Sequence, residues 1–232
     1  MCAACTRNEE TQCAHLFPLL NGAYAEFLVV PERIARVNLL PVPPGLAPEV
    51  AALVEPLACC LHGVARAGIR EGDTVAVLGA GPIALMLCAC VADAGGRPIV
   101  VGGRAERRAL APAFGAVTGV GAGADVAIEA TGTPDGWHDA VSLVRTGGTA
   151  VLFGGLPAGA EVALDATRIH YEELTVRGAF HHTPRTLRAA LAFLASRARP
   201  WERLLTHDVA LEGVAALFAD PPRDYLKAVV RP

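Results

Sequence analysis

The chain has 232 residues, of which 53% are hydrophobic and 19% charged, and its formal net charge is -3. It is long enough to bury a substantial core, and a slightly acidic chain with few aromatic residues gives no reason to expect a nucleic-acid partner. The seven cysteines come in close groups rather than at the dispersed spacing of a disulfide scaffold, and no basic-then-apolar leader precedes them. We therefore expect a cytoplasmic protein.

Three cysteines stand close together at the start of the chain. Cys2, Cys5 and Cys13 follow the spacing C-x2-C-x7-C. Cysteines this dense are typical of a knuckle around zinc or of a disulfide-rich secreted chain, and the spacing alone leaves both interpretations open.

The segment from residue 20 to residue 58 predicts two strands, a proline-rich turn around Pro41 to Pro48 and then a helix. After it, residues 74 to 92 carry no charge over a length that could cross a membrane. Glycines and a proline inside this stretch would interrupt a membrane-spanning helix, so we expect a buried strand, a glycine turn and a buried helix instead. No membrane partner is expected.

From residue 74 onward, short apolar runs alternate with segments of helical length. The runs end at Gly or Thr and are almost continuously apolar, which is the pattern of strands buried on both faces of a parallel sheet. The expected strands are 74 to 79, 98 to 103, 125 to 132, 148 to 155 and 174 to 180. This βαβα alternation predicts an α/β fold with a doubly wound, Rossmann-type parallel sheet. A helix from Thr183 to Arg197 and a last strand in YLKAVVRP are expected after it.

A glycine turn joins the first of these strands to the helix that follows. The sequence GAGPIA begins at Gly79 and ends at Ala84, and in this context it is a dinucleotide-binding fingerprint. Gly79 makes the tight turn, Gly81 lets the backbone approach a pyrophosphate, and Ala84 is small enough for close packing of helix and strand. Pro82 and Ile83 begin the helix whose N–H groups would bind the pyrophosphate. The alternative is a glycine turn in an unrelated parallel fold.

The end of the second strand indicates which dinucleotide is bound. A site for NAD normally has Asp or Glu there, to bind the ribose 2′-hydroxyl, but this chain has Gly103 followed by Arg104, with Arg107 and Arg108 close by. A guanidinium in place of a carboxylate removes repulsion of a 2′-phosphate and offers it a bidentate partner. We therefore expect NADP(H) rather than NAD(H); the alternative is that Arg104 is a solvated surface arginine.

Several segments together resemble a known family. They are NGAYAEF, EPLACCLHGV, GDTVAVLGAGPIA, GADVAIEATG, VRTGGTAVLFGG and HYEELTVRGAFHHTP, in this order. The chain resembles the zinc-dependent medium-chain alcohol dehydrogenases, in particular their polyol (sorbitol-like) and threonine dehydrogenase branch. The resemblance implies the remnant of a mainly β, GroES-like catalytic domain at 1–57, an NADP-binding Rossmann domain at 58–183, and a return segment at 184–232 that packs on the catalytic domain.

The resemblance also implies two zinc sites. The family's structural-zinc lobe has four cysteines at C-x2-C-x2-C-x7-C; Cys2, Cys5 and Cys13 match the last three, and the first would precede the chain. Water or His15 could take the fourth place. Glu55 matches a ligand of the catalytic zinc, whose partner ligands have no counterpart here, so we expect an N-terminally truncated chain without the main catalytic apparatus. A carboxylate that stabilises a helix N-terminus is the alternative for Glu55.

Further cofactor contacts are implied by the resemblance. Two neighbouring strands end at the carboxyl edge of the expected sheet, where α/β folds bind ligands. The residues at these ends would line the adenosine and nicotinamide regions; they are Ala130, Thr131, Gly132, Phe153, Gly154 and Gly155. Lys227 matches a basic position near the pyrophosphate, with a solvated strand lysine as the equal alternative.

One departure from the family lies between residues 117 and 122. Family members have a strand and then a helix here, whereas this chain has only VTGVGA. A parallel crossover needs a dozen or more residues. We therefore expect either a short edge strand with an irregular link or the loss of that strand.

Three functions follow from these patterns. The first is an oxidoreductase that moves a hydride between NADP(H) and a secondary alcohol or polyol and its ketone. The alternatives are a non-catalytic dinucleotide-binding remnant and a zinc-independent medium-chain reductase. The resemblance implies a small-molecule substrate and a homo-oligomer, either a dimer or a tetramer.

Overall fold

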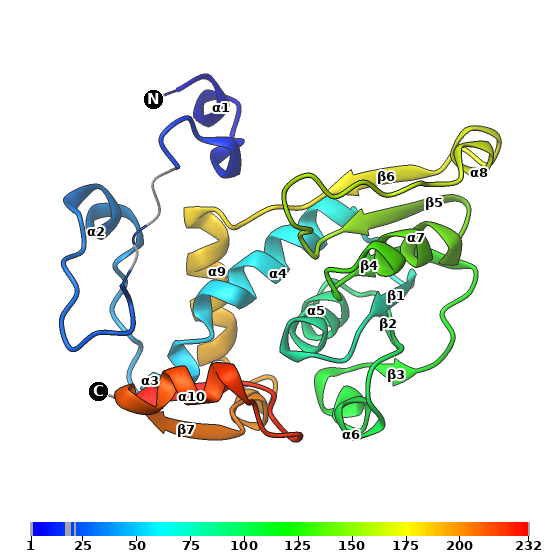
Figure 1. Cartoon of the computed structure of the whole chain (residues 1–232). Coiled ribbons are helices and arrows are strands. Elements are labelled where there is room, and N and C mark those ends of the chain that lie inside the picture. Colours follow the sequence, from blue (N-terminus) through cyan, green and yellow to red (C-terminus); the bar gives the residue numbers. More distant parts are fainter. Residues whose placement is uncertain (1, 17–19, 21, 232) are drawn as a thin grey trace. The chain divides into compact units, whose positions relative to one another are not determined.

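The computed structural model describes residues 2–16, 20 and 22–231 of the chain (Figure 1). The chain divides into two compact units. The flanking unit contains the residues up to Glu55 together with those from His182 onward. The sheet unit is Pro56–His181.

The described part of the sheet unit contains one parallel sheet of six strands, in the order β3-β2-β1-β4-β5-β6. The strands are β1 Thr74–Leu78, β2 Arg97–Val101, β3 Val117–Thr118, β4 Ala124–Glu129, β5 Val144–Leu152 and β6 Thr175–Gly178. The strand order runs outward from β1 on one side and from β4 on the other, so the topological switch point lies between these two strands. The expected doubly wound α/β fold is confirmed.

Helices lie beside this sheet (Figure 1). They are α4 Val54–Ala67, whose first two residues belong to the flanking unit, α5 Pro82–Asp93, α6 Ala105–Arg108, α7 Pro134–Leu143 and α8 Ala166–Tyr171, with a 3-10 turn at Ala111–Phe114. Helix α5 is apolar throughout and mostly buried, as the sequence predicted. Residues 104 to 116 form two short helical pieces rather than one helix, because Pro112 has no N–H for an intrahelical bond.

The edge strand expected in VTGVGA forms, and it is short. Strand β3 pairs with β2 through only two positions, Ile99 with Val117 and Val100 with Thr118. No helix follows it in the described residues before β4 begins. The first of the two expected alternatives, a short edge strand with an irregular link, is therefore confirmed.

The flanking unit is built from short helices and one small sheet. Its helices are α1 Ala3–Thr6, α2 Glu32–Asn38, α3 Pro48–Ala51, α9 Pro184–Ala195 and α10 Val214–Ala219, with 3-10 turns at Glu10–Gln12, Trp201–Leu204 and Leu211–Gly213. The sheet pairs β7, His207–Ala210, in parallel with β8, Ala228–Arg231. The capping box of Thr183 and Thr186 fixes the start of α9.

The two strands expected between residues 20 and 58 are wrong for the residues that the structure describes. That range forms α2, α3 and the first residues of α4, and no part of it is paired as a strand; Asn21, from the NGAYAEF motif, lies outside the described residues. A strand needs a neighbouring strand for its backbone N–H and C=O groups. The apolar side chains of Phe27 and Val29 are 90% and 86% exposed, so this segment buries no face within the described chain.

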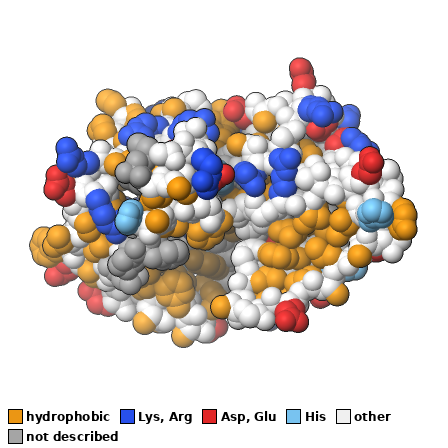
Figure 2. Space-filling view, turned by 90° about the horizontal axis from the view of Figure 1, so that it is seen from above, with side chains coloured by type: hydrophobic (Ala, Val, Ile, Leu, Met, Phe, Trp, Pro, Cys, Tyr) orange, Lys and Arg blue, Asp and Glu red, His pale blue; other side chains and the backbone are white. Residues whose placement is uncertain are grey.

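Apolar residues also reach the surface elsewhere. Figure 2 shows hydrophobic side chains gathered in exposed areas of one face. Large exposed apolar residues of the sheet unit include Tyr171 and Phe180.

Among the described residues, Pro48–Ala67 is the helical stretch long and apolar enough to cross a membrane by length and composition alone, and 44% of its most apolar window is buried. Residues 74 to 92 form β1, the glycine turn and α5, as expected.

Candidate functional site

The glycine turn lies between β1 and α5, at the carboxyl edge of the sheet. Gly79 has a φ of +109°, a conformation that favours glycine, and its N–H donates to the carbonyl of Val101 at 2.8 Å. A Cβ on Gly81 would meet no protein atom within 4 Å, so the backbone at the start of α5 is open to a ligand. Pro82 and Ile83 begin α5, and Ala84 is fully buried against the sheet.

The loop after β2 is fixed beside this turn. Gly103 has a φ of +76°, and a Cβ on it would lie 2.5 Å from the Cβ of Ala80. Arg108 donates from Nη1 to the carbonyl of Gly103 at 2.6 Å, and Arg104, which is exposed, is the N-cap residue just before α6. Position 103 therefore has no room for a side chain, including the carboxylate that selects NAD.

The ends of β4 and β5 complete this edge. Ala130 donates its N–H to the carbonyl of Leu78, so the residues after β4 continue beside β1. Phe153 and Gly154, which follow β5, donate their N–H groups to the carbonyl of Glu129 at 3.2 and 3.0 Å. The expected residues Gly79, Gly81, Gly103, Arg104, Ala130, Thr131, Phe153, Gly154 and Gly155 thus follow four strands that end at one edge of the sheet.

Gly63 was missed in the sequence analysis. It lies in α4, and a Cβ on it would be 2.7 Å from Cδ2 of Phe153. The absence of a side chain at this position lets the ring of Phe153 lie directly against the helix. A glycine in the interior of a helix was the only signal in the sequence.

Glu129 was also missed, and it lies at the centre of this edge. Its side chain is fully buried, and Oε1 accepts hydrogen bonds from the N–H of Thr131 at 2.5 Å, the hydroxyl of Thr131 at 2.5 Å and the N–H of Gly132 at 2.8 Å. Oε2 accepts from the N–H of Gly154 at 3.2 Å. A charged residue at the end of an apolar run was the signal that could have identified it, because buried carboxylates need such partners.

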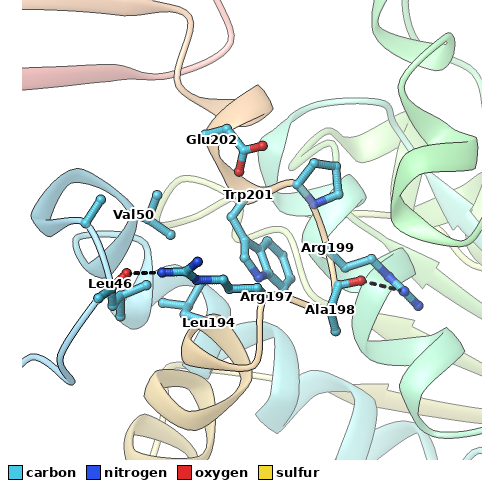
Figure 3. A pocket seen from close by; sticks show the side chains of 11 residues that line it. Leu46, Val50, Leu194, Arg197, Ala198, Arg199, Trp201 and Glu202 are labelled. Carbon is cyan, nitrogen blue, oxygen red and sulfur yellow. Dashed lines mark hydrogen bonds between the residues drawn. The ribbon is translucent and has the colours of Figure 1, made fainter.

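A pocket of about 630 Å³ lies in the flanking unit, between the segment after Gly45 and the end of α9 (Figure 3). Arg197 donates to the carbonyl of Gly45, and the ring of Trp201 packs edge-on against Phe193 with centroids 5.2 Å apart. In Figure 3 the side chains of Arg197 and Arg199 point in different directions. The polar groups do not converge on one point, so this pocket is not the candidate active site.

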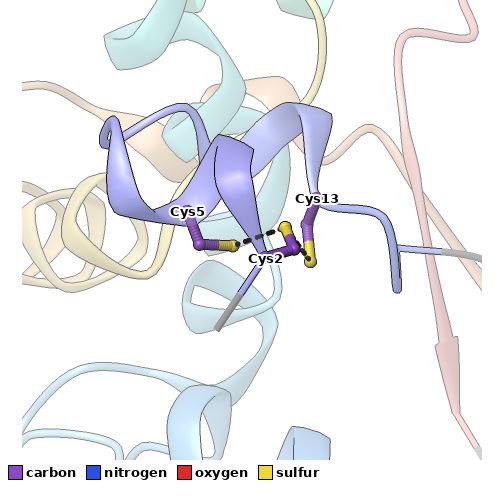
Figure 4. A group of neighbouring side chains, drawn as sticks. All are labelled: Cys2, Cys5 and Cys13. Atoms are coloured by element: carbon purple, nitrogen blue, oxygen red, sulfur yellow. Dashed lines mark hydrogen bonds between the residues drawn. The ribbon is translucent and has the colours of Figure 1, made fainter.

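The three N-terminal cysteines lie together (Figure 4). The sulfur of Cys2 is 3.6 Å from that of Cys5 and 4.0 Å from that of Cys13, and all three are free thiols. A tetrahedral zinc ion with bonds of about 2.3 Å would hold its sulfurs about 3.8 Å apart. The spacing fits three ligands of such a site. Among the described residues, the group within 4.8 Å includes no ring nitrogen of His15.

Hydrogen bonds shift the pKa values of Cys2 and Cys5 in opposite directions. The pKa of Cys2 is lowered to about 6, chiefly because the N–H of Ala14 donates to its sulfur, followed by the N–H and the thiol of Cys5. The pKa of Cys5 is raised to about 11 by its hydrogen bonds with the sulfurs of Cys13 and Cys2. Cys2 therefore ionises more readily than Cys5, and the thiolate is the form that binds a metal ion.

The remaining expected residues lie in the flanking unit. Glu55 is in the first turn of α4, half exposed, and its Oε1 is 4.0 Å from Nε2 of His182. The side chain of His182 itself is almost buried. Lys227 precedes β8, and its carbonyl accepts from the N–H of Thr206 at 2.9 Å. The roles expected for Glu55 and Lys227 stay predictions.

Comparison with known proteins gives a consistent set of similarities. The model of the family described as "Zinc-binding dehydrogenase" matches residues 82–196. L-galactonate-5-dehydrogenase of Escherichia coli is 33% identical over 227 residues, which cover 89% of this chain and 64% of that protein. D-altritol 5-dehydrogenase of Agrobacterium fabrum is 30% identical over a region that covers 96% of this chain and 70% of that protein. The chain thus spans about two thirds of the length of these relatives.

Solved structures are similar over the whole chain. A zinc-binding dehydrogenase of Sinorhizobium meliloti, determined bound to NADP, superposes with a TM-score of 0.89 at 30% identity and covers 100% of this chain and 73% of that one. The alcohol dehydrogenase TADH of a Thermus species gives a TM-score of 0.86 at 28% identity, and the superposition covers 100% of this chain and 76% of that one.

Proposed function

Because this chain belongs to the family of zinc-binding dehydrogenases, we propose that it binds NADP(H) as part of an oxidoreductase acting on a secondary alcohol or polyol and its ketone. When bound, the nucleotide supplies or accepts the hydride. The residues of the sheet edge would hold it. The backbone at Gly81 and the start of α5 would bind the pyrophosphate, and the residues at the ends of β4 and β5 would line the adenosine and nicotinamide regions.

The loop after β2 carries the preference for NADP(H). The positive φ of Gly103 and its contact with Ala80 leave no space for the acidic side chain that binds the ribose 2′-hydroxyl in NAD sites. Arg104 follows it, exposed at the start of α6, where a guanidinium would pair with a 2′-phosphate. Arg108, which binds the Gly103 carbonyl, would shape this loop rather than contact the phosphate.

Nucleotide binding by the full chain tests this proposal. We expect NADPH to bind more tightly than NADH in a fluorescence titration at moderate salt, and Arg104→Ala to weaken NADPH binding by roughly tenfold while leaving NADH binding unchanged. Arg70→Ala, at an exposed arginine before β1, is the matched control. Equal binding of both nucleotides that Arg104→Ala leaves unchanged would contradict the preference.

Zinc at the N-terminal thiols is the second part of the proposal. Cys2, Cys5 and Cys13 would supply three thiolates, and the distances between their sulfurs support this assignment. Glu55 would contribute to a separate, catalytic ion. We expect Cys5→Ser to lower the zinc bound per chain and Cys59→Ser to leave it unchanged, as measured by metal analysis after dialysis. Equal zinc in both variants would contradict a site at these thiols.

Measurements of turnover separate this function from its alternatives. Alcohol-dependent reduction of NADP⁺ that stops on chelation supports the zinc-dependent oxidoreductase. Turnover that survives chelation would instead indicate a zinc-independent reductase, and nucleotide binding without turnover a non-catalytic remnant.

A homo-oligomer in the cytoplasm completes the proposal. Strand β6 lies at one end of the strand order, and Tyr171 and Phe180, on either side of it in the sequence, are exposed. An unpaired strand edge beside apolar side chains supports pairing with a second copy. Light scattering on the purified chain should give a dimer or tetramer; a monomer at micromolar concentration would contradict this part.

A further inference from the structure

We infer that Glu129 is a positioning residue of the nucleotide site: its buried carboxylate holds the loop after β4 and the loop after β5 in one fixed arrangement. This inference rests on the proposed function, because these two loops are the ones expected to contact the nucleotide. It gives a role to a fully buried charged side chain that the glycine fingerprint and the arginines do not involve.

The carboxylate joins the two loops through its two oxygens. Oε1 binds the loop after β4, by accepting from Thr131 and Gly132, and Oε2 binds the loop after β5, by accepting from Gly154. Within the described residues, no Lys or Arg side chain forms an ion pair with Glu129. The carboxylate is thus held by three backbone N–H groups and one hydroxyl, whose positions it fixes in return.

The surrounding residues leave no freedom for a different arrangement. A Cβ on Gly154 would lie 2.5 Å from Oε2, and a Cβ on Gly136, in α7, would lie 2.7 Å from Oε1. The indole N–H of Trp137 donates to the carbonyl of Gly154 at 2.9 Å and so also holds this loop. Two glycines and a tryptophan therefore enclose the carboxylate and the loop that it binds.

This arrangement has a consequence for binding rather than for folding alone. Phe153 and Gly154 follow β5 directly, and Thr131 follows β4, so a shift of either loop moves residues that line the proposed site. A site held within about 0.5 Å of its productive geometry binds more tightly than one whose loops must be ordered on binding. Glu129 supplies that order before the nucleotide arrives.

The test uses Glu129→Gln, which keeps the shape of the side chain. The amide oxygen can still accept from Thr131 and Gly132, but the amide NH₂ would then face the N–H of Gly154 and break its bond to the side chain. The N–H of Gly154 would keep its second bond, to the main-chain carbonyl of residue 129. We expect NADPH binding to weaken about tenfold, or about 1.4 kcal/mol. The amide of Gly154 should exchange with solvent faster in NMR spectra, while that of Gly132 stays protected.

The matched control is Asp125→Asn, at the other carboxylate of β4. It changes the opposite end of the strand, so we expect it to leave NADPH affinity unchanged. Gly136→Ala is a second probe, since it crowds both the hydroxyl of Thr131 and Oε1 of Glu129 and leaves the carboxylate in place. It should weaken binding in the same direction as Glu129→Gln.

The outcomes are distinct. If the wild-type chain bound neither NADPH nor NADH, the proposed function would fail and this inference with it. If the wild-type chain bound NADPH and Glu129→Gln bound it equally well, the inference alone would be overturned. A loss of affinity in Asp125→Asn equal to that in Glu129→Gln would also overturn it, because a general loss of stability would then explain both.

Discussion

Strand β4 carries a carboxylate near each end, and the two have opposite surroundings. Asp125, at the amino end, is 27% exposed and accepts from the N–H of Thr74 and from Nε of Arg145, both at 2.8 Å. Glu129, at the carboxyl end, is fully buried and is bound by N–H groups of two loops and one hydroxyl. The same residue chemistry thus joins strands at one edge of the sheet and loops at the other.

The difference shows that the two edges of one sheet can have different tasks, stability at the amino edge and ligand binding at the carboxyl edge. At the amino edge, Asp125 pairs with a cation in contact with water, which adds modestly to stability and requires little precision. At the carboxyl edge, where parallel α/β folds bind ligands, a buried carboxylate without a cation requires every donor in place. Substitutions at the two ends should therefore differ in both size and kind.

The largest effect is expected at Glu129. Glu129→Ala leaves the N–H groups of Thr131 and Gly132 without their acceptor in a buried site and opens a cavity, while the N–H of Gly154 keeps only the main-chain carbonyl of residue 129. We therefore expect the free energy of unfolding to fall by about 3 kcal/mol or more. Urea unfolding followed by circular dichroism measures it. Asp125→Ala is the matched control, with an expected loss of about 1 kcal/mol. Equal losses in the two variants would remove the distinction between the two edges.

The sequence predicted the sheet unit closely because its elements depend mainly on their own residues. The apolar runs of β1 and β4 are buried on both faces, and the glycines between β1 and α5 require their own backbone geometry. The segment around Phe27 was predicted wrongly as strand, because pairing depends on a distant neighbour that local β-propensity does not specify.

The candidate site was predictable only where a fingerprint exists. Gly79, Gly81 and Arg104 follow from the spacing of the Rossmann pattern. Glu129 and Gly136 did not follow, because their contact joins the end of a strand to a helix seven residues later, and no local pattern specifies which side chain that helix must lack. The proximity of His182 to Glu55 did not follow for a similar reason, since these two residues come together only in the fold.

A smaller effect is expected at Gly136. Alanine normally stabilises a helix relative to glycine by about 0.5–1 kcal/mol, but a Cβ here would lie 2.3 Å from Oγ1 of Thr131 and 2.7 Å from Oε1 of Glu129, to which that hydroxyl is bonded. We expect Gly136→Ala to lower the free energy of unfolding by about 2 kcal/mol, as overpacking of a filled site does. Gly178→Ala, in β6, meets no atom within 4 Å and should be neutral or slightly stabilising. A stabilising Gly136→Ala would show that the carboxylate can move.

The smallest effect, and the one that depends on pH, is expected for Asp125→Asn. The N–H of Thr74 and then the guanidinium of Arg145 hold the pKa of Asp125 below its usual value. A carboxylate with a lowered folded pKa stabilises the fold fully above its unfolded pKa of about 3.9, and this contribution is lost as pH falls through the folded pKa.

Asp125→Asn should therefore cost about 1 kcal/mol at pH 7, because an amide cannot pair with Arg145 as a charge does. The difference between wild type and variant should shrink as pH falls below about 4, where the wild-type carboxylate itself takes up a proton. Urea unfolding at pH 7, 5 and 3 measures this difference. A difference that stayed constant over this range would mean that Asp125 acts through shape alone, and the amino edge would then resemble the carboxyl edge in depending on geometry rather than charge.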